Sequence, residues 1–248
     1  MSIRVSRNSP VLLKKSMRQN DFLVPTRPVD FDRKLILDAF AGARVADVRD
    51  AMDMCGMHAF GSMQPEIHLI TFGRVVGFAL TTRYMPFIGT VPKLDAEGYR
   101  AWADEYKSTI APRPWQDDIQ PGDVIVIDQC GLDVGVLGSR NTLRCMLMGA
   151  IGFITNGGVR DTDDLRERKV PVWAKGTAQT MVQGRVRFES CYQPVEVGGA
   201  LVHHGDVIVA DGDGVIVVPR EFAERVAGIA SQEARLDLDI RRTLEAQM

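Results

Sequence analysis

Two stretches of the sequence share one design, and they constrain the fold more than any other feature. Residues 121–131 read PGDVIVIDQCG, and residues 203–214 read HHGDVIVADGDG. Gly122 aligns with Gly205 and Asp128 with Asp211, at the same spacing of 83 residues. Each stretch passes from a Gly-Asp turn into a run of Val and Ile, which is typical of a buried strand. The match is too short for a solenoid repeat, so we interpret it as two similar strands that each end in an aspartate.

Predicted strands and helices alternate along the chain, and we find no internal linker. This alternation indicates an α/β protein. We expect residues 1–30, which are polar and contain three prolines, to form an N-terminal arm, and residues 31–248 to form a single domain that ends in a long amphipathic helix. The predicted helices are 31–40, 43–57, 95–110, 141–151 and 219–248, and further predicted strands are 73–84, 152–156, 170–176 and 184–190.

The charge and cysteine content exclude several classes of protein. With a formal net charge of −2 and a pI of about 6.1, the chain has no basic field that would attract nucleic acid. None of the four cysteines forms a Cys-x-x-Cys pair, which argues against a zinc site and favours reduced thiols. The first residues do not resemble a signal peptide, and no apolar run has the ~18 residues of a membrane span. We therefore expect a cytoplasmic protein without nucleic-acid or membrane partners.

The segment Gly138-Ser139-Arg140-Asn141 precedes a predicted helix. The first backbone N–H groups of a helix are unpaired and carry partial positive charge, so a carboxylate or phosphate can bind there. The alternative interpretation is a Ser or Asn cap without any ligand.

A second candidate site follows the predicted strand 152–156. There, Gly157-Gly158 are interpreted as a turn that leads to Arg160 and Asp161. Open α/β sheets bind ligands beyond the carboxyl ends of their strands. A guanidinium there suits a carboxylate or an enolate oxygen, and an aspartate suits Mg²⁺. The alternative is that Asp161, Asp163 and Asp164 cap a short helix while the arginine is solvated.

Other reactive residues are weaker candidates. The DGDG at 211–214 lacks the glutamate of an EF-hand, because its twelfth position is Phe222, so we interpret it as a tight turn between strands. His203 and His204 are adjacent in a predicted strand and would point to opposite faces. Lys175 is a conceivable Schiff-base lysine, but its neighbours do not indicate a desolvated pocket.

Four stretches taken together resemble the RraA-like proteins, a family that includes 4-hydroxy-4-methyl-2-oxoglutarate / 4-carboxy-4-hydroxy-2-oxoadipate aldolases. They are ARVADVRDAM with GRVVGFALT, PGDVIVID, GSRNTLRCMLMGAIGFITNGGVRDTDDL, and PVEVGGALVHHGDVIVADGDGVIVVP, and they cover most of residues 40–220. The resemblance implies an α/β/β/α sandwich related to swivelling phosphohistidine domains. It also implies a homotrimer or hexamer with the active site between subunits.

The resemblance further implies an activity and a set of site residues. The loop Gly138, Ser139, Arg140 and Asn141 would bind the carboxylate of an oxo-acid substrate through its amides. Arg160 would contact that carboxylate and the C2 oxygen, and Asp161 would anchor Mg²⁺, Mn²⁺ or another divalent ion. The implied reaction is metal-dependent cleavage of a 4-hydroxy-2-oxo acid to pyruvate and a second oxo acid, with oxaloacetate decarboxylation at the same site.

The sequence departs from the family pattern at two places. The aldolases usually have Leu or Met where this chain has Asn141, and residues 86–120 are longer than in small family members. Arg140 and Asn141 favour one alternative, a lyase or dehydratase acting on a sugar-derived acid. A second alternative is a regulator that binds and inhibits ribonuclease E, as some family members do, although those members lack the full aldolase pair or its metal site and this chain keeps the pair Arg160-Asp161.

Overall fold

The computed structural model describes residues 32–248, so the predicted N-terminal arm, residues 1–30, lies outside the described residues. The helices are α1 (Arg33–Ala39), α2 (Val45–Met54), α3 (Ala96–Thr109), α4 (Ser139–Leu147), α5 (Thr162–Glu167) and α6 (Ala223–Glu245), with short 3₁₀ turns η1 (Pro114–Asp118) and η2 (Arg220–Phe222). The strands are β1 (His68–Leu69), β2 (Val75–Pro86), β3 (Asp123–Asp128), β4 (Ala150–Val159), β5 (Val172–Thr177), β6 (Val186–Cys191), β7 (Val195–Val197), β8 (Ala200–Val202), β9 (Val207–Asp211) and β10 (Gly214–Val218).

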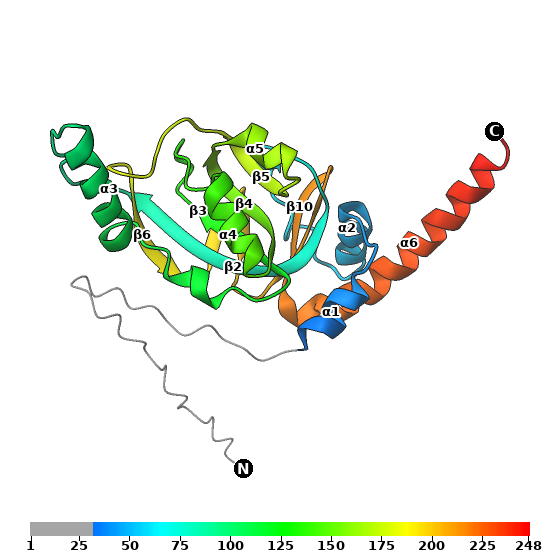
Figure 1. The fold of residues 1–248 in the computed structure, drawn as a ribbon. Helices are drawn as coiled ribbons and strands as arrows, with labels where there is room; N and C mark the ends of the chain where they lie inside the picture. Colours follow the sequence, from blue (N-terminus) through cyan, green and yellow to red (C-terminus); the bar gives the residue numbers. More distant parts are fainter. Residues whose placement is uncertain (1–31) are drawn as a thin grey trace, which may run out of the picture.

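An eight-stranded sheet forms the centre of the fold. Its order is β1-β5-β4-β3-β2-β9-β10, and β6 also pairs with β2. Strands β2, β3, β4 and β5 are parallel, whereas β9 runs antiparallel to β2. The long β2 curves through the middle of the sheet (Figure 1) and pairs in turn with β9, β3 and β6. The parallel strands bring the carboxyl ends of β3 and β4 to the same edge, where the site residues lie.

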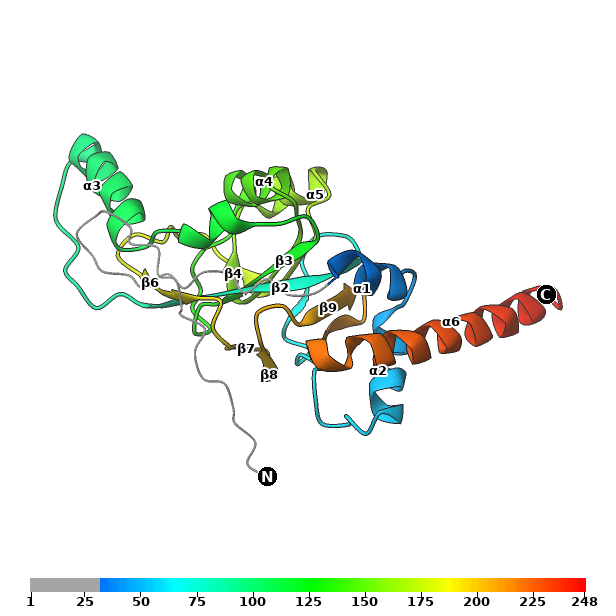
Figure 2. The same cartoon turned by 90° about the horizontal axis from the view of Figure 1, so that it is seen from below.

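Helices cover one face of this sheet and a second β layer covers part of the other. Side chains alternate along β2, so that Phe78 and Leu80 pack with the helices while Ala79 packs on the opposite face. The opposite face is covered by the β7–β8 hairpin, with Val195 and Val202 buried there. Figure 2 shows α4 and α5 on one side of the sheet and the hairpin on the other. This layering confirms the α/β class expected from the alternating elements and the sandwich type that the resemblance implied.

The duplicated stretch forms the same turn twice. Asp123 accepts a hydrogen bond from the N–H of Gln120, and Asp206 accepts one from the N–H of His203, both at 2.8 Å. The preceding glycines have φ of +86° and +88°, in the left-handed region that glycine favours. The two strands, β3 and β9, lie on either side of β2. The two stretches that are 83 residues apart in the sequence therefore have the same local structure, a turn followed by a strand.

The predicted turn at Gly157-Gly158 is wrong, because β4 continues through both glycines to Val159. Neither glycine has a positive φ. A Cβ on Gly157 would lie 1.7 Å from Nε2 of Gln129, and one on Gly158 would lie 2.5 Å from Cβ of Ala178. The glycines therefore serve close packing, and not a change of chain direction.

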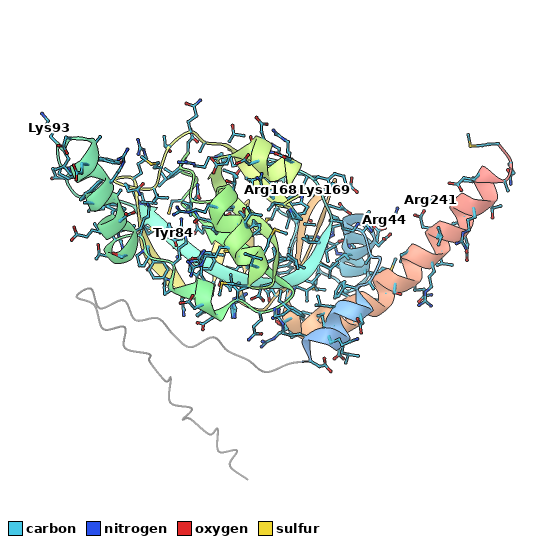
Figure 3. All side chains as sticks on the ribbon, in the orientation of Figure 1. Arg44, Tyr84, Lys93, Arg168, Lys169 and Arg241 are labelled. Carbon is cyan, nitrogen blue, oxygen red and sulfur yellow. The ribbon has the colours of Figure 1, made fainter. Side chains whose placement is uncertain are left out.

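The C-terminal helix α6 begins against the body of the protein and then extends away from it (Figures 1 and 2). Its buried residues are all in its first half, from Ala223 to Ala230. Arg44, labelled beside α2 in Figure 3, joins α2 to α6, because Nη2 lies 2.5 Å from Asp47 and 2.6 Å from Asp237. Of the helices formed by residues 32–248, none has the length and apolar character of a membrane span.

Candidate active site

Five of the predicted site residues line one pocket of about 300 Å³ at the carboxyl ends of β3 and β4. They are Gly138, Arg140, Asn141, Arg160 and Asp161. The pocket lies where the loop after β3 leads into α4 and the chain leaves β4. The backbone holds these segments together, since Leu137 pairs with Val159 and the N–H of Arg160 donates to the carbonyl of Leu137 at 3.1 Å. Two segments separated in the sequence therefore form one site.

Asp161 does not cap the helix that follows it. Its backbone has φ 60° and ψ 35°, a left-handed conformation that is uncommon outside glycine, and its carboxylate makes no capping bond to α5. Instead Oδ2 accepts hydrogen bonds from the N–H of Ser139 at 3.0 Å and from its hydroxyl at 3.3 Å. The remaining aspartates of the segment form exposed ion pairs, Asp163 with Arg166 of α5 and Asp164 with Arg168 just after the helix. The unusual backbone thus aims the carboxylate at the start of α4.

Arg160 lies against two glycines. A Cβ on Gly135 would lie 2.5 Å from Cδ of Arg160, and one on Gly138 would lie 3.2 Å from its Cγ. Nε of Arg160 donates to Oδ1 of Asp161 at 3.3 Å, and each of these side chains is about one-third exposed. Arg160 is therefore neither simply solvated nor fully buried, and its guanidinium remains accessible from the pocket.

The Gly138 loop holds an anion at the start of α4, and in this structure the anion is the carboxylate of Asp161. Gly138 is extended, with φ −165° and ψ 173°, and its carbonyl accepts from the N–H groups of Asn141 and Thr142 at 3.1 Å. A Cβ at this position would lie 2.7 Å from Oδ2 of Asp161. A carboxylate of the protein itself therefore occupies the N–H of Ser139, and binding of a substrate carboxylate by the loop stays a prediction.

The donors fit a magnesium ion better than a zinc ion. Among residues 32–248, no three His, Cys, Asp or Glu side chains gather as a metal cluster. Mg²⁺ is commonly held by one or two carboxylates together with waters and substrate oxygens. Asp161, a partly exposed carboxylate in a polar pocket, matches that donor set.

The pocket also contains residues that the sequence did not identify. Lys107 and Arg113 come from the extra segment 86–120, and Met181, Val182 and Gln183 come from the loop after β5. The length of segment 86–120 was the only signal, and it did not indicate which side chains would reach the pocket.

The weaker candidates do not join this site. Lys175 is half-exposed and lies 4.0 Å from Glu66. His203 and His204 lie beyond the end of β8, not within a strand as predicted, because the Asp206 turn begins there. The ring of His204 instead packs on Tyr192, with centroids 4.9 Å apart. The DGDG segment forms the β9–β10 hairpin turn, as predicted.

Comparison with known proteins places the chain in one protein family. A family model described as RraA-like, Aldolase/RraA, matches residues 45–217. The chain is 26% identical to protein DlpA of Legionella pneumophila over 194 residues, which are 77% of this chain and 28% of that protein. It is 33% identical over 115 residues to a Halalkalibacterium halodurans protein named "Putative 4-hydroxy-4-methyl-2-oxoglutarate aldolase", covering 44% of this chain and 52% of that protein. The matched regions therefore span only part of both relatives.

Two solved structures share the fold over most of their length. One is RraAS2 of Streptomyces coelicolor, described as an unusual member of the RNase ES inhibitor RraA family, with a TM-score of 0.68, 25% identity, and coverage of 86% of this chain and 99% of that one. The other is an uncharacterized protein from Pseudomonas syringae, with a TM-score of 0.70, 24% identity, and coverage of 87% and 94%. At that identity, the second similarity concerns the fold alone.

Proposed function

Because the chain belongs to the RraA-like family, we propose that it is a divalent-metal-dependent aldolase that cleaves a 4-hydroxy-2-oxo acid to pyruvate and a second oxo acid. The observation that carries this proposal is the convergence of Arg160, Asp161 and the Gly138 loop on one pocket. The names of several relatives include the same aldolase activity. Nothing in this assignment requires a lysine Schiff base.

In the proposed reaction, a general base takes the proton of the 4-hydroxyl, a C4 carbonyl forms and the C3–C4 bond breaks. The electron pair of that bond remains on the pyruvate fragment as an enolate, which is then protonated at C3. The Gly138 loop orients the C1 carboxylate, and Arg160 places fixed positive charge beside the C2 oxygen, where negative charge develops. A divalent ion held by Asp161 would supply Lewis-acid polarisation of the 2-oxo group.

The same residues are suited to oxaloacetate decarboxylation. Loss of CO₂ from oxaloacetate leaves the same enolate, so Arg160 would stabilise the same developing charge. We include this reaction as a second activity of the proposed site.

Pyruvate release coupled to lactate dehydrogenase tests the assignment. The substrates are 4-hydroxy-4-methyl-2-oxoglutarate and oxaloacetate, each with Mg²⁺, with Mn²⁺ and with EDTA. We expect turnover that EDTA abolishes and that Arg160→Ala and Asp161→Ala each reduce by at least about 100-fold, with unchanged circular dichroism. Near-normal activity in either variant would show that the site is wrongly placed.

Binding and inhibition of ribonuclease E is the second candidate function. It is favoured by the similarity to RraAS2, whose description names that inhibitor family. Capture of a ribonuclease E fragment by the purified protein, together with no pyruvate release from either substrate, would favour this function over the aldolase.

We also propose that the protein assembles as a homotrimer or hexamer with the active site between subunits, as the family resemblance implies. Large apolar side chains are exposed on the described surface, among them Phe60, Phe72 and Leu201. Size-exclusion chromatography with light scattering measures the assembly directly, and a monomer at micromolar concentration would contradict this part of the proposal.

A further inference from the structure

We propose that Arg113 and Lys107 bind a second carboxylate of the substrate, at the end remote from the pyruvate moiety. This inference rests on the aldolase function proposed above and deepens it. Both substrates proposed above, 4-hydroxy-4-methyl-2-oxoglutarate and oxaloacetate, carry such a second carboxylate, and the new element is that the extra segment 86–120 would supply the residues that recognise it.

The extra segment is folded directly onto the loop that binds the first carboxylate. Nη2 of Arg113 donates to the carbonyl of Val136 at 3.3 Å, and Val136 lies two residues before Gly138. Lys107 lies in the last turn of α3 and lines the same pocket as Arg160 and Asp161. Both cationic groups are therefore placed within the substrate pocket by tertiary contacts, although they are far from Arg160 in the sequence.

The charges in the pocket are unbalanced. Four cationic side chains line it, namely Lys107, Arg113, Arg140 and Arg160, and the only carboxylate among the lining residues is Asp161. That carboxylate is already engaged by Arg160 and Ser139. The substrate's C1 carboxylate balances one further cation, which leaves more positive charge than a monocarboxylate can neutralise.

Arg113 and Lys107 are available for a second anion. Within residues 32–248, Arg113 has no carboxylate within ion-pair distance, and its hydrogen bond to Val136 uses one of the five N–H donors of a guanidinium. Lys107 pairs with Asp104 at 3.1 Å, but Asp104 is 81% exposed. Exposed pairs of this kind contribute little free energy, so the ammonium can exchange its partner for a buried carboxylate at small cost.

The helix that carries Lys107 is held in position by aromatic packing. The ring of Tyr106 contacts Trp102 and Phe87 with centroid distances of 5.2 and 5.3 Å, and its hydroxyl donates to the carbonyl of Val186 at 2.8 Å. Nε2 of Gln183, which also lines the pocket, donates to the carbonyl of Ala103 in α3 at 3.5 Å. These contacts fix the backbone beside Lys107, so the Lys107 side chain starts from a fixed position beside the pocket that it lines.

Equilibrium binding of two unreactive acids tests the inference without turnover. The 2-oxoglutarate molecule has the carbon skeleton of 4-hydroxy-4-methyl-2-oxoglutarate without the methyl group and the 4-hydroxyl, so it cannot undergo retro-aldol cleavage, whereas pyruvate lacks the second carboxylate. We would measure both dissociation constants by calorimetry with Mg²⁺ present. We expect the wild-type protein to bind 2-oxoglutarate at least about tenfold more tightly than pyruvate, as one charge-assisted contact allows.

Substitutions at single residues test which side chains cause the preference for 2-oxoglutarate over pyruvate. Arg113→Met should weaken 2-oxoglutarate binding about 10- to 100-fold and leave pyruvate binding nearly unchanged, and Lys107→Met should act in the same direction. Arg113→Lys, which keeps the charge, should recover part of the affinity. The matched control is Arg144→Met, which removes an exposed positive charge from α4 outside the pocket and should leave both constants unchanged. Thermal melts would identify any variant that fails to fold.

Equal affinity of the wild-type protein for the two acids would overturn the proposal. The proposal would also be overturned if Arg113→Met weakened the binding of 2-oxoglutarate and of pyruvate by the same factor. In either case, pyruvate binding would leave the proposed aldolase function standing. Binding of neither acid at millimolar concentration would overturn both.

Discussion

Replacing Gly138 with alanine tests the geometry of the site with a single methyl group. The backbone of Gly138 is extended, a conformation that any residue adopts, so the substitution introduces no backbone strain. The added Cβ would lie 2.7 Å from Oδ2 of Asp161, whereas an ordinary contact begins at 3.4 Å. Relief of the overlap requires a shift of about 0.7 Å at the Asp161 carboxylate or at the start of α4.

The size of the effect follows from the hydrogen bond that this shift breaks. The bond from the N–H of Ser139 to Asp161 is 3.0 Å long, and a stretch to about 3.7 Å would take it beyond hydrogen-bonding distance. Overpacking and the lost bond together should destabilise the protein by about 1–3 kcal/mol. For a protein of this size, that corresponds to a melting temperature lower by roughly 2–4 °C per kcal/mol. Displacement of the carboxylate should lower pyruvate formation about 10- to 100-fold.

The assay combines thermal melts with coupled pyruvate release, and Gly228→Ala is the matched control. A Cβ on Gly228, inside α6, would meet nothing within 4 Å. Alanine there should stabilise the helix by about 0.5–1 kcal/mol without affecting activity. If Gly138→Ala matched the wild-type protein in both melting temperature and turnover, the close approach between Gly138 and Asp161 would be refuted.

Two further predictions concern stability and thiol reactivity. Burial opposes ionisation of Asp47, but hydrogen bonds from Arg44 outweigh it and hold the pKa of this carboxyl below its usual value. A lowered folded pKa stabilises the protein above the unfolded pKa of about 4 and loses that effect as the pH falls through the folded pKa. Arg44→Ala should therefore cost about 1–3 kcal/mol at pH 7, and urea titrations should show a smaller cost below pH 4; a constant cost would contradict the pairing. Burial raises the pKa of the Cys191 thiol to about 12 and also raises that of Cys145, so mass spectrometry after iodoacetamide treatment at pH 8 should find the exposed Cys130 alkylated well before these two buried cysteines. Early loss of the Cys191 thiol would show that this part of the core opens readily.

The sequence predicted the elements whose signals are local. The alternating strands and helices are indicated by the spacing of apolar residues along each segment. The duplicated turn before β3 and β9 depends on a hydrogen bond between residues three positions apart, such as that from His203 to Asp206. The Gly138 loop and the Arg160-Asp161 pair were likewise visible as a helix start and a strand end. The hypothesis that they belong to one site came from the family resemblance, and the structure places them in one pocket.

The sequence did not predict features that depend on tertiary packing. Gly157 and Gly158 have the pattern of a turn, but their lack of side chains makes room for Gln129 and Ala178. The pair His203 and His204 follows apolar residues and was assigned to a strand, although the Asp206 turn ends that strand first. The contact between Arg113 and Val136 joins residues 23 positions apart, and no local pattern indicates it.

The course of β2 has a consequence for how the protein melts. Residues 75–78 pair with β9, residues 78–83 with β3, and residues 82–86 with β6. The same strand contributes Phe78 to the core beneath α1, α2 and α6, and Leu80 to the core beneath α4. If β9 separated from β2, or if β3 and β6 did, part of β2 would lose its hydrogen-bonded neighbours. The pairing of the rest of the same strand would then be weakened as well. We therefore expect the candidate pocket and the C-terminal helix, although far apart, to unfold as one cooperative unit.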